Sequence, residues 1–90
     1  DDVELEAAAF GPPDCPAVLW LVAGATPTRA THVAFRADTR EDVERFHEAA
    51  VAAGGISRNA PRRWPIFRRG EFNAVVADPD GNLIEAVAPE

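Results

Sequence analysis

The sequence contains no lysine, no methionine and a single cysteine. Cys15 cannot form an internal disulfide, so we expect an inert thiol in a reducing compartment such as the cytoplasm. The lack of methionine, even at position 1, leads us to expect a processed chain or a piece of a longer one. No apolar run approaches the roughly 18 residues that span a bilayer, and no signal peptide is visible, so a membrane is not an expected partner.

Basic charge is also scarce, because nine arginines stand against 15 acidic residues and the formal net charge is −6. A general nucleic-acid binder needs a basic surface, so we expect no nucleic-acid partner. Five of the arginines nevertheless gather between positions 56 and 72, namely Arg58, Arg62, Arg63, Arg68 and Arg69. This cluster is interpreted either as a solvated loop or as a rim that attracts an anionic small molecule through bidentate hydrogen bonds.

The remaining residues predict a small folded protein. A chain of 90 residues forms one domain at most. It buries roughly 60% of its unfolded surface, which leaves a thin core. Apolar residues make up 47% of the chain, which favours a folded protein over a disordered one.

Alternating apolar residues between turn signals predict strands at 3–10, 17–22, 30–37, 71–77 and 83–88, with a short one near 56–59. One helix is predicted over 40–53, where four apolar residues recur at helical spacing. These residues are Val43, Phe46, Ala50 and Ala53. Asp38 or Thr39 can cap the start of the helix, and the glycine pair at 54–55 ends it. The predicted fold class is therefore α+β.

The last predicted strand carries a charge in the middle of its apolar run, Glu85. A buried carboxylate is costly unless it is paired or bound to a metal. Glu85 therefore either lies on an exposed face or takes part in chemistry. The preceding turn contains Asp78 and Asp80, which we expect to shape it by accepting backbone hydrogen bonds.

The two ends of the chain contain similar segments. "PDCPAVLWLVA" near the start resembles "PDGNLIEAVA" near the end, with one residue inserted. Both are a Pro-Asp turn followed by an apolar strand, and Trp20 falls opposite Glu85. The similarity suggests a duplicated unit whose first copy lacks its beginning.

Two longer segments, "THVAFRADTREDVERFHEAAVAAGG" (31–55) and "GEFNAVVADPDGNLIEAV" (70–87), resemble the vicinal oxygen chelate superfamily. This group includes glyoxalase I, bleomycin-resistance proteins and extradiol dioxygenases. The resemblance implies a complete βαβββ module over 30–90 and two strands of a truncated first module over 1–29. In the family, two such modules form a cup around a divalent metal.

The resemblance also implies which residues hold that metal. Family ligands lie on the first and last strands of a module, which are adjacent, and the matching positions are His32 and Glu85. Val33 and Phe35 would then pack under the helix, so that His32 faces the cup. Histidine and carboxylate ligands suit Zn, Fe(II), Mn or Ni, and Glu85 could also act as a catalytic base. We expect Glu85 to contribute little to the core. His47 lies beside the apolar stripe of the helix, on the far side from the cup, and is not expected to be a ligand.

The chain departs from the family pattern at several positions. The strand that supplies a third histidine ligand in many relatives is absent, and Trp20 stands where some relatives carry a carboxylate. Ile66, Phe67 and Arg68 replace a His-Tyr-His-like run. The residues expected to contact substrate are Trp20, Arg36, Arg68, Phe72 and Asn73.

Two functions remain open at this stage. One is a metal-dependent lyase, isomerase or dioxygenase that binds two neighbouring oxygens of a small oxygen-rich molecule. The other is a metal-free protein, similar to bleomycin-resistance proteins, that sequesters a small molecule in the cup. One and a half modules cannot close a cup and would leave an unpaired sheet edge, so we expect a homodimer or a missing N-terminal segment.

Overall fold

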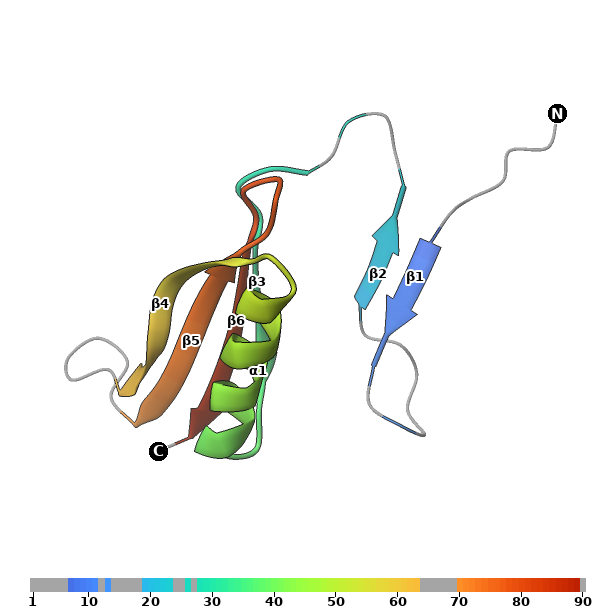
Figure 1. Cartoon of the computed structure of the whole chain (residues 1–90). Helices are drawn as coiled ribbons and strands as arrows, with labels where there is room; N and C mark the ends of the chain where they lie inside the picture. Colours follow the sequence, from blue (N-terminus) through green and yellow to red (C-terminus); the bar gives the residue numbers. More distant parts are fainter. Residues whose placement is uncertain are drawn as a thin grey trace, which may run out of the picture.

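The computed structural model describes residues 7–11, 13, 19–23, 26, 28–63 and 70–89. Within these residues the chain forms one helix and six strands (Figure 1). Their order is β1 (Ala7–Phe10), β2 (Leu19–Val22), β3 (His32–Arg36), α1 (Arg40–Ala52), β4 (Ile56–Arg63), β5 (Glu71–Ala77) and β6 (Leu83–Pro89). Among the described residues, no helix is long and apolar enough to cross a membrane.

Four of the strands form one sheet in the order β3-β6-β5-β4. β3 pairs with β6 in parallel, whereas β5 pairs with both β6 and β4 in the antiparallel sense. The first and last strands of the module are therefore neighbours, as the family resemblance implied. This βαβββ arrangement confirms the predicted α+β fold class.

Helix α1 packs against one face of the sheet, over β4, β5 and β6 (Figure 1). Of the two caps considered, the structure selects Thr39, whose hydroxyl accepts a hydrogen bond of 3.1 Å from the backbone N–H of Asp42. The helix ends as predicted, with Gly54 at a φ of 106° that a residue with a side chain rarely adopts.

The hydrophobic core lies between α1 and the inner strands of the sheet. It consists of Val43, Phe72, Ala74, Ala86 and Ala88, with Phe46 and Ala37 packed against it. The expectation that Val33 and Phe35 pack under the helix is wrong. Both are only half-buried and lie outside this cluster, because α1 contacts the other three strands of the sheet but not the edge strand β3.

Strand β4 is longer than the short strand predicted near 56–59. Its pairing with β5 shifts register twice, between Ser57 and Asn59 and again between Asn59 and Arg62. Pro61 is tolerated because β4 is an edge strand with an irregular ladder. Arginine and proline break the alternating apolar pattern in this segment, so the sequence did not predict the full length of the strand.

The turn between β5 and β6 is held by Asp78. Its carboxylate accepts hydrogen bonds from the backbone N–H groups of Asp80 and Asn82 at 2.9 and 2.8 Å, and from the Asn82 side chain at 2.9 Å. Asp78 therefore shapes the turn as predicted, whereas Asp80 contributes its backbone as a donor. The Asn82 side chain also binds the backbones of Thr28 and Thr31, which fixes the start of β3 beside β6.

Strands β1 and β2 form a separate antiparallel hairpin. Within the described part of the chain, neither strand contacts α1 or the four-stranded sheet. Phe10 and Leu21 are about half exposed on this hairpin, at 50% and 55%. A lone two-stranded sheet is marginally stable in water, so the hairpin needs a surface to pack on.

Candidate functional site

The structure brings His32 and Glu85 into direct contact. Nε2 of His32 lies 2.8 Å from Oε1 of Glu85. In the parallel β3–β6 ladder, His32 is opposite Leu83 and Glu85 is opposite Ala34, so the two residues are diagonal neighbours on one face. Because this is the face away from the core cluster under α1, it is the face that would line a cup.

The two members of this pair differ sharply in burial. Glu85 is 1% exposed and is one of the largest fully buried side chains described, whereas the His32 side chain is 51% exposed. The expectation that Glu85 contributes little to the buried interior is therefore wrong. Its carboxylate is compensated by hydrogen bonds, including one of 2.6 Å from Nδ2 of Asn73 to Oε2.

Asn73 lies beside Glu85, but it is 0% exposed. The sequence predicted a substrate contact here, and the structure places the side chain beneath the surface instead. Its carbonyl oxygen accepts a hydrogen bond of 3.2 Å from Nδ2 of Asn59, on the next strand. Sequence reasoning missed Asn59, for which the one available signal was an asparagine in a strand, a residue that strands disfavour.

Phe72 does not belong to this face. It is 5% exposed within the core cluster under α1, and the Arg40 guanidinium lies 4.5 Å from the centre of its ring. Alternation along β5 places Asn73 on one face and Phe72 on the other. We therefore assign Phe72 to the core rather than to substrate contact.

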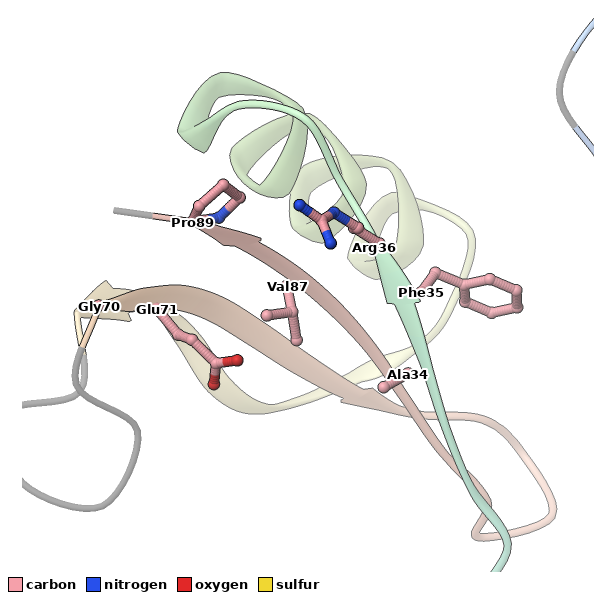
Figure 2. A pocket seen from close by; sticks show the side chains of 7 residues that line it. All are labelled: Ala34, Phe35, Arg36, Gly70, Glu71, Val87 and Pro89. Atoms are coloured by element: carbon pink, nitrogen blue, oxygen red, sulfur yellow. The ribbon is translucent and has the colours of Figure 1, made fainter.

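Arg36 shares the face of His32 and Glu85 and is exposed. It lines an open cavity of about 420 Å³ together with Ala34, Phe35, Gly70, Glu71, Val87 and Pro89. Figure 2 shows that these residues come from β3, the start of β5 and the end of β6, with the Phe35 ring pointing away from the others. The cavity adjoins Glu85, because Ala34 is its register partner.

The other expected contacts fall outside this site or outside the described residues. Trp20 lies in β2, which does not contact the four-stranded sheet, and its side chain is not described. Arg68 and the rest of 64–69 also lie outside the described residues. His47 is on α1, where Nε2 lies 2.6 Å from the Ser57 hydroxyl, away from Glu85 as predicted.

The donor atoms of the pair suit a divalent metal in chemical type. Imidazole nitrogen and carboxylate oxygen bind such ions at about 2.0–2.2 Å, and atoms 2.8 Å apart can reach one ion together. Within the described ranges, no group of three or more His, Cys, Asp and Glu residues is placed to hold a metal. The pair therefore offers two donor side chains, and any further ligand of a metal would have to come from elsewhere.

Comparison with known proteins places this geometry in context. The family model of the glyoxalase/bleomycin resistance protein/dioxygenase superfamily matches residues 1–86. No curated protein matches the sequence.

Two solved structures are similar to the chain. A glyoxalase/bleomycin resistance protein/dioxygenase family enzyme from Burkholderia phytofirmans PsJN is 26% identical, with a TM-score of 0.58 over 72% of this chain and 49% of its own. Hypothetical protein SA1046 from S. aureus is 20% identical and shares the fold, with a TM-score of 0.57 over 68% of this chain and 44% of its own. The chain thus spans less than half the length of either protein. The family match over nearly the whole sequence, together with the βαβββ sheet, shows that the chain belongs to the glyoxalase/bleomycin resistance protein/dioxygenase superfamily.

Proposed function

We propose that the chain supplies part of a metal-dependent site, similar to those of glyoxalases and dioxygenases, that acts on a small oxygen-rich molecule. The observation that carries this proposal is the 2.8 Å contact between His32 Nε2 and Glu85 Oε1 on the face away from α1. His32 and Glu85 are the proposed ligands of Zn, Fe(II), Mn or Ni. Bound there, such an ion supplies Lewis acidity toward two neighbouring oxygens of a substrate.

The two side chains have distinct tasks in this proposal. When Glu85 is ionised it only accepts hydrogen bonds, and the His32–Glu85 contact without metal then needs a proton on Nε2 of His32. That proton must leave Nε2 before His32 can act as a ligand there. Oε1 of Glu85 lies directly beneath the exposed His32, and a substrate bound at the pair could give up a proton to this carboxylate.

The neighbouring cavity indicates what kind of molecule would bind. Its described charged side chains are Arg36 and Glu71, and the Arg36 guanidinium can form bidentate hydrogen bonds with a carboxylate or phosphate. Val87, Pro89 and Ala34 add apolar lining. These features favour a small substrate with an apolar body and a polar group that binds Arg36.

A further ligand has to come from outside the described module. We propose that a second copy of the chain, water or the substrate supplies it. Strands β1 and β2 contain no His, Cys, Asp or Glu, so they supply no metal ligand themselves. They are the element available to hold a second copy in place, because Phe10 and Leu21 are exposed on them and they pack on nothing described in the chain. A homodimer in which each hairpin covers the partner's sheet would bury these residues.

A metal-free sequestering protein is the second candidate. It is favoured by the absence, among the described residues, of a cluster of three or more metal-ligating side chains. In that case the cavity beside Arg36 would hold a small molecule, and the His32–Glu85 pair would be a structural contact.

Metal content separates the two functions. Elemental analysis of the complete protein, purified without chelators, is expected to find about one divalent ion per cup. Glu85→Ala and His32→Ala should each lose it, whereas His47→Ala should retain it, because His47 lies on the other side of the sheet. A metal-free parent protein that still binds small anions would support sequestration instead.

A further inference from the structure

We propose that Asn73 is a positioning residue for Glu85, held in turn by Asn59, so that Oε1 of Glu85 is kept turned toward His32. This assignment replaces the substrate contact expected from the sequence at Asn73. The positioning role of Asn73 does not depend on the proposed function. Only the identity of the ion that would bind at Oε1 depends on it.

Four polar side chains form a continuous row across the sheet, one from each strand. Nδ2 of Asn59 in β4 donates to Oδ1 of Asn73 in β5 at 3.2 Å, and Nδ2 of Asn73 donates to Oε2 of Glu85 in β6 at 2.6 Å. Oε1 of Glu85 then meets Nε2 of His32 in β3 at 2.8 Å. The row joins the edge strand β4 to the opposite edge strand β3.

The chemistry of the four groups gives this row one direction. A carboxylate can only accept hydrogen bonds, so Asn73 must turn its NH₂ group toward Glu85. Asn59 donates a hydrogen bond to the carbonyl oxygen of the same Asn73 amide. This contact favours the observed orientation of the Asn73 side chain over the flipped one. Asn59 therefore acts on Glu85 through Asn73, although no contact between Asn59 and Glu85 is needed.

Burial differs along this row of four side chains. Asn73 is 0% exposed and Glu85 is 1% exposed, whereas the His32 side chain is half exposed. The row thus opens to solvent at the histidine. A ligand that arrives from the open side therefore meets His32 first, and Glu85 and Asn73 lie beneath it.

The irregular pairing of β4 places Asn59 in this row. In an unbroken ladder Arg58 would pair with Val75, because Ser57 pairs with Val76. The register shift instead puts Asn59 opposite Val75, on the same face as Glu85. Such bulges are common beside functional sites, where they redirect a side chain.

The consequence is that the two oxygens of Glu85 are not equivalent. Oε2 accepts the Asn73 amide, so a cation held by His32 would meet Oε1 first. Partners that orient a ligand in this way typically change metal affinity by roughly 10–100-fold when they are removed.

The first test uses crystal structures of the metal-free full chain. Asn73→Leu keeps the side-chain size but removes the amide, and Asn59→Ala leaves Asn73 in place. We expect the His32–Glu85 contact to be lost in Asn73→Leu and Glu85 to occupy more than one conformer in Asn59→Ala. A single Glu85 conformer that keeps the 2.8 Å contact in both variants would overturn the proposal. If Asn73→Leu fails to fold, Asn59→Ala decides by the same criterion.

The second test uses zinc alone, with Val43→Ala as a control that disturbs the core on the other face. Zinc affinity should fall roughly 10–100-fold in Asn73→Leu, several-fold in Asn59→Ala and not at all in Val43→Ala. Infrared spectra should show the Glu85 carboxylate changing from one-oxygen to two-oxygen ligation in Asn73→Leu. Unchanged affinity and an unchanged carboxylate spectrum in Asn73→Leu would mean that Asn73 is only structural. If the parent protein binds no zinc, the proposed function fails, and the crystal structures still decide the positioning role.

Discussion

Oε1 of Glu85 lies 2.8 Å from Nε2 of His32, although the two residues are 53 positions apart in the sequence. The contact exists because the first and last strands of the βαβββ module pair in parallel. One partner is buried and the other is half exposed, so the pair connects the interior of the sheet to its open face.

The burial of Glu85 makes its replacement costly. Glu85→Ala leaves the amide of Asn73 without its carboxylate partner and opens a space in the sheet. We expect the free energy of unfolding to fall by about 1–3 kcal/mol, measured by urea denaturation. Glu85→Gln fills the same space and should cost less. Equal stability of Glu85→Ala and the parent protein would show that the Asn73 and His32 contacts contribute nothing to folding.

Asp78 should make stability depend on pH in acid. Its partial burial raises the pKa, but hydrogen bonds from the side chain and backbone of Asn82 and from Asp80 outweigh this and hold the pKa below 3.8. A lowered folded-state pKa stabilises the protein above pH 3.8, and this contribution is lost as the pH falls through the folded value. Asp78→Ala should therefore be less stable than the parent at pH 7, by about 1–3 kcal/mol. In denaturant titrations the difference should shrink below pH 3.8. A difference that stays constant down to pH 2 would contradict the role given to the ionised carboxylate.

Gly55 should not tolerate a side chain. A Cβ atom there would lie 2.4 Å from Cγ1 of Val76 and 2.9 Å from the carbonyl oxygen of Ala50. Gly55→Ala is expected to destabilise the fold by about 1–3 kcal/mol through overpacking. Adding Val76→Ala should recover part of that loss, so the two changes should be non-additive in thermal or urea unfolding. Simple additivity would mean that the helix end moves away from β5 at little cost.

The hairpin should control assembly. If β1 and β2 pack on a second copy, Phe10→Ser and Leu21→Ser should weaken the dimer, because both residues are about half exposed in the single chain. Light scattering over a dilution series is expected to show a shift toward monomer in these variants, with Val51→Ser on the exposed side of α1 as a control. A stable parent monomer of 9.7 kDa would contradict this assembly.

Local sequence signals predicted much of the fold. The apolar stripe, Thr39 among the possible caps, and the glycine pair define α1 nearly to the residue, and 71–77 is a strand with the predicted bounds. These features depend on residues that are close together in the sequence, so the local pattern of residue types can predict them. The contact between His32 and Glu85 followed instead from the family resemblance, because pairing of distant strands leaves no local signal.

The parts that were missed depend on packing over longer distances. The sequence does not show that α1 leaves β3 uncovered, so Val33 and Phe35 were placed under it wrongly. The register shifts in β4 decide that Asn59 joins the site, and neither shift is visible in the sequence. The burial of Glu85 was missed because it depends on Asn73, whose side chain was expected to face a ligand.

Calorimetric titration of the complete protein with zinc tests the central claim most directly. We expect about one ion per cup for the parent protein and for His47→Ala, and no binding for Glu85→Gln or His32→Ala. Affinity should weaken in acid, because metal ligands must be deprotonated to bind. Absence of zinc binding by the parent protein, with Mn, Ni and Fe(II) equally without effect, would contradict the metal-dependent function. Binding that survives Glu85→Gln would contradict the site.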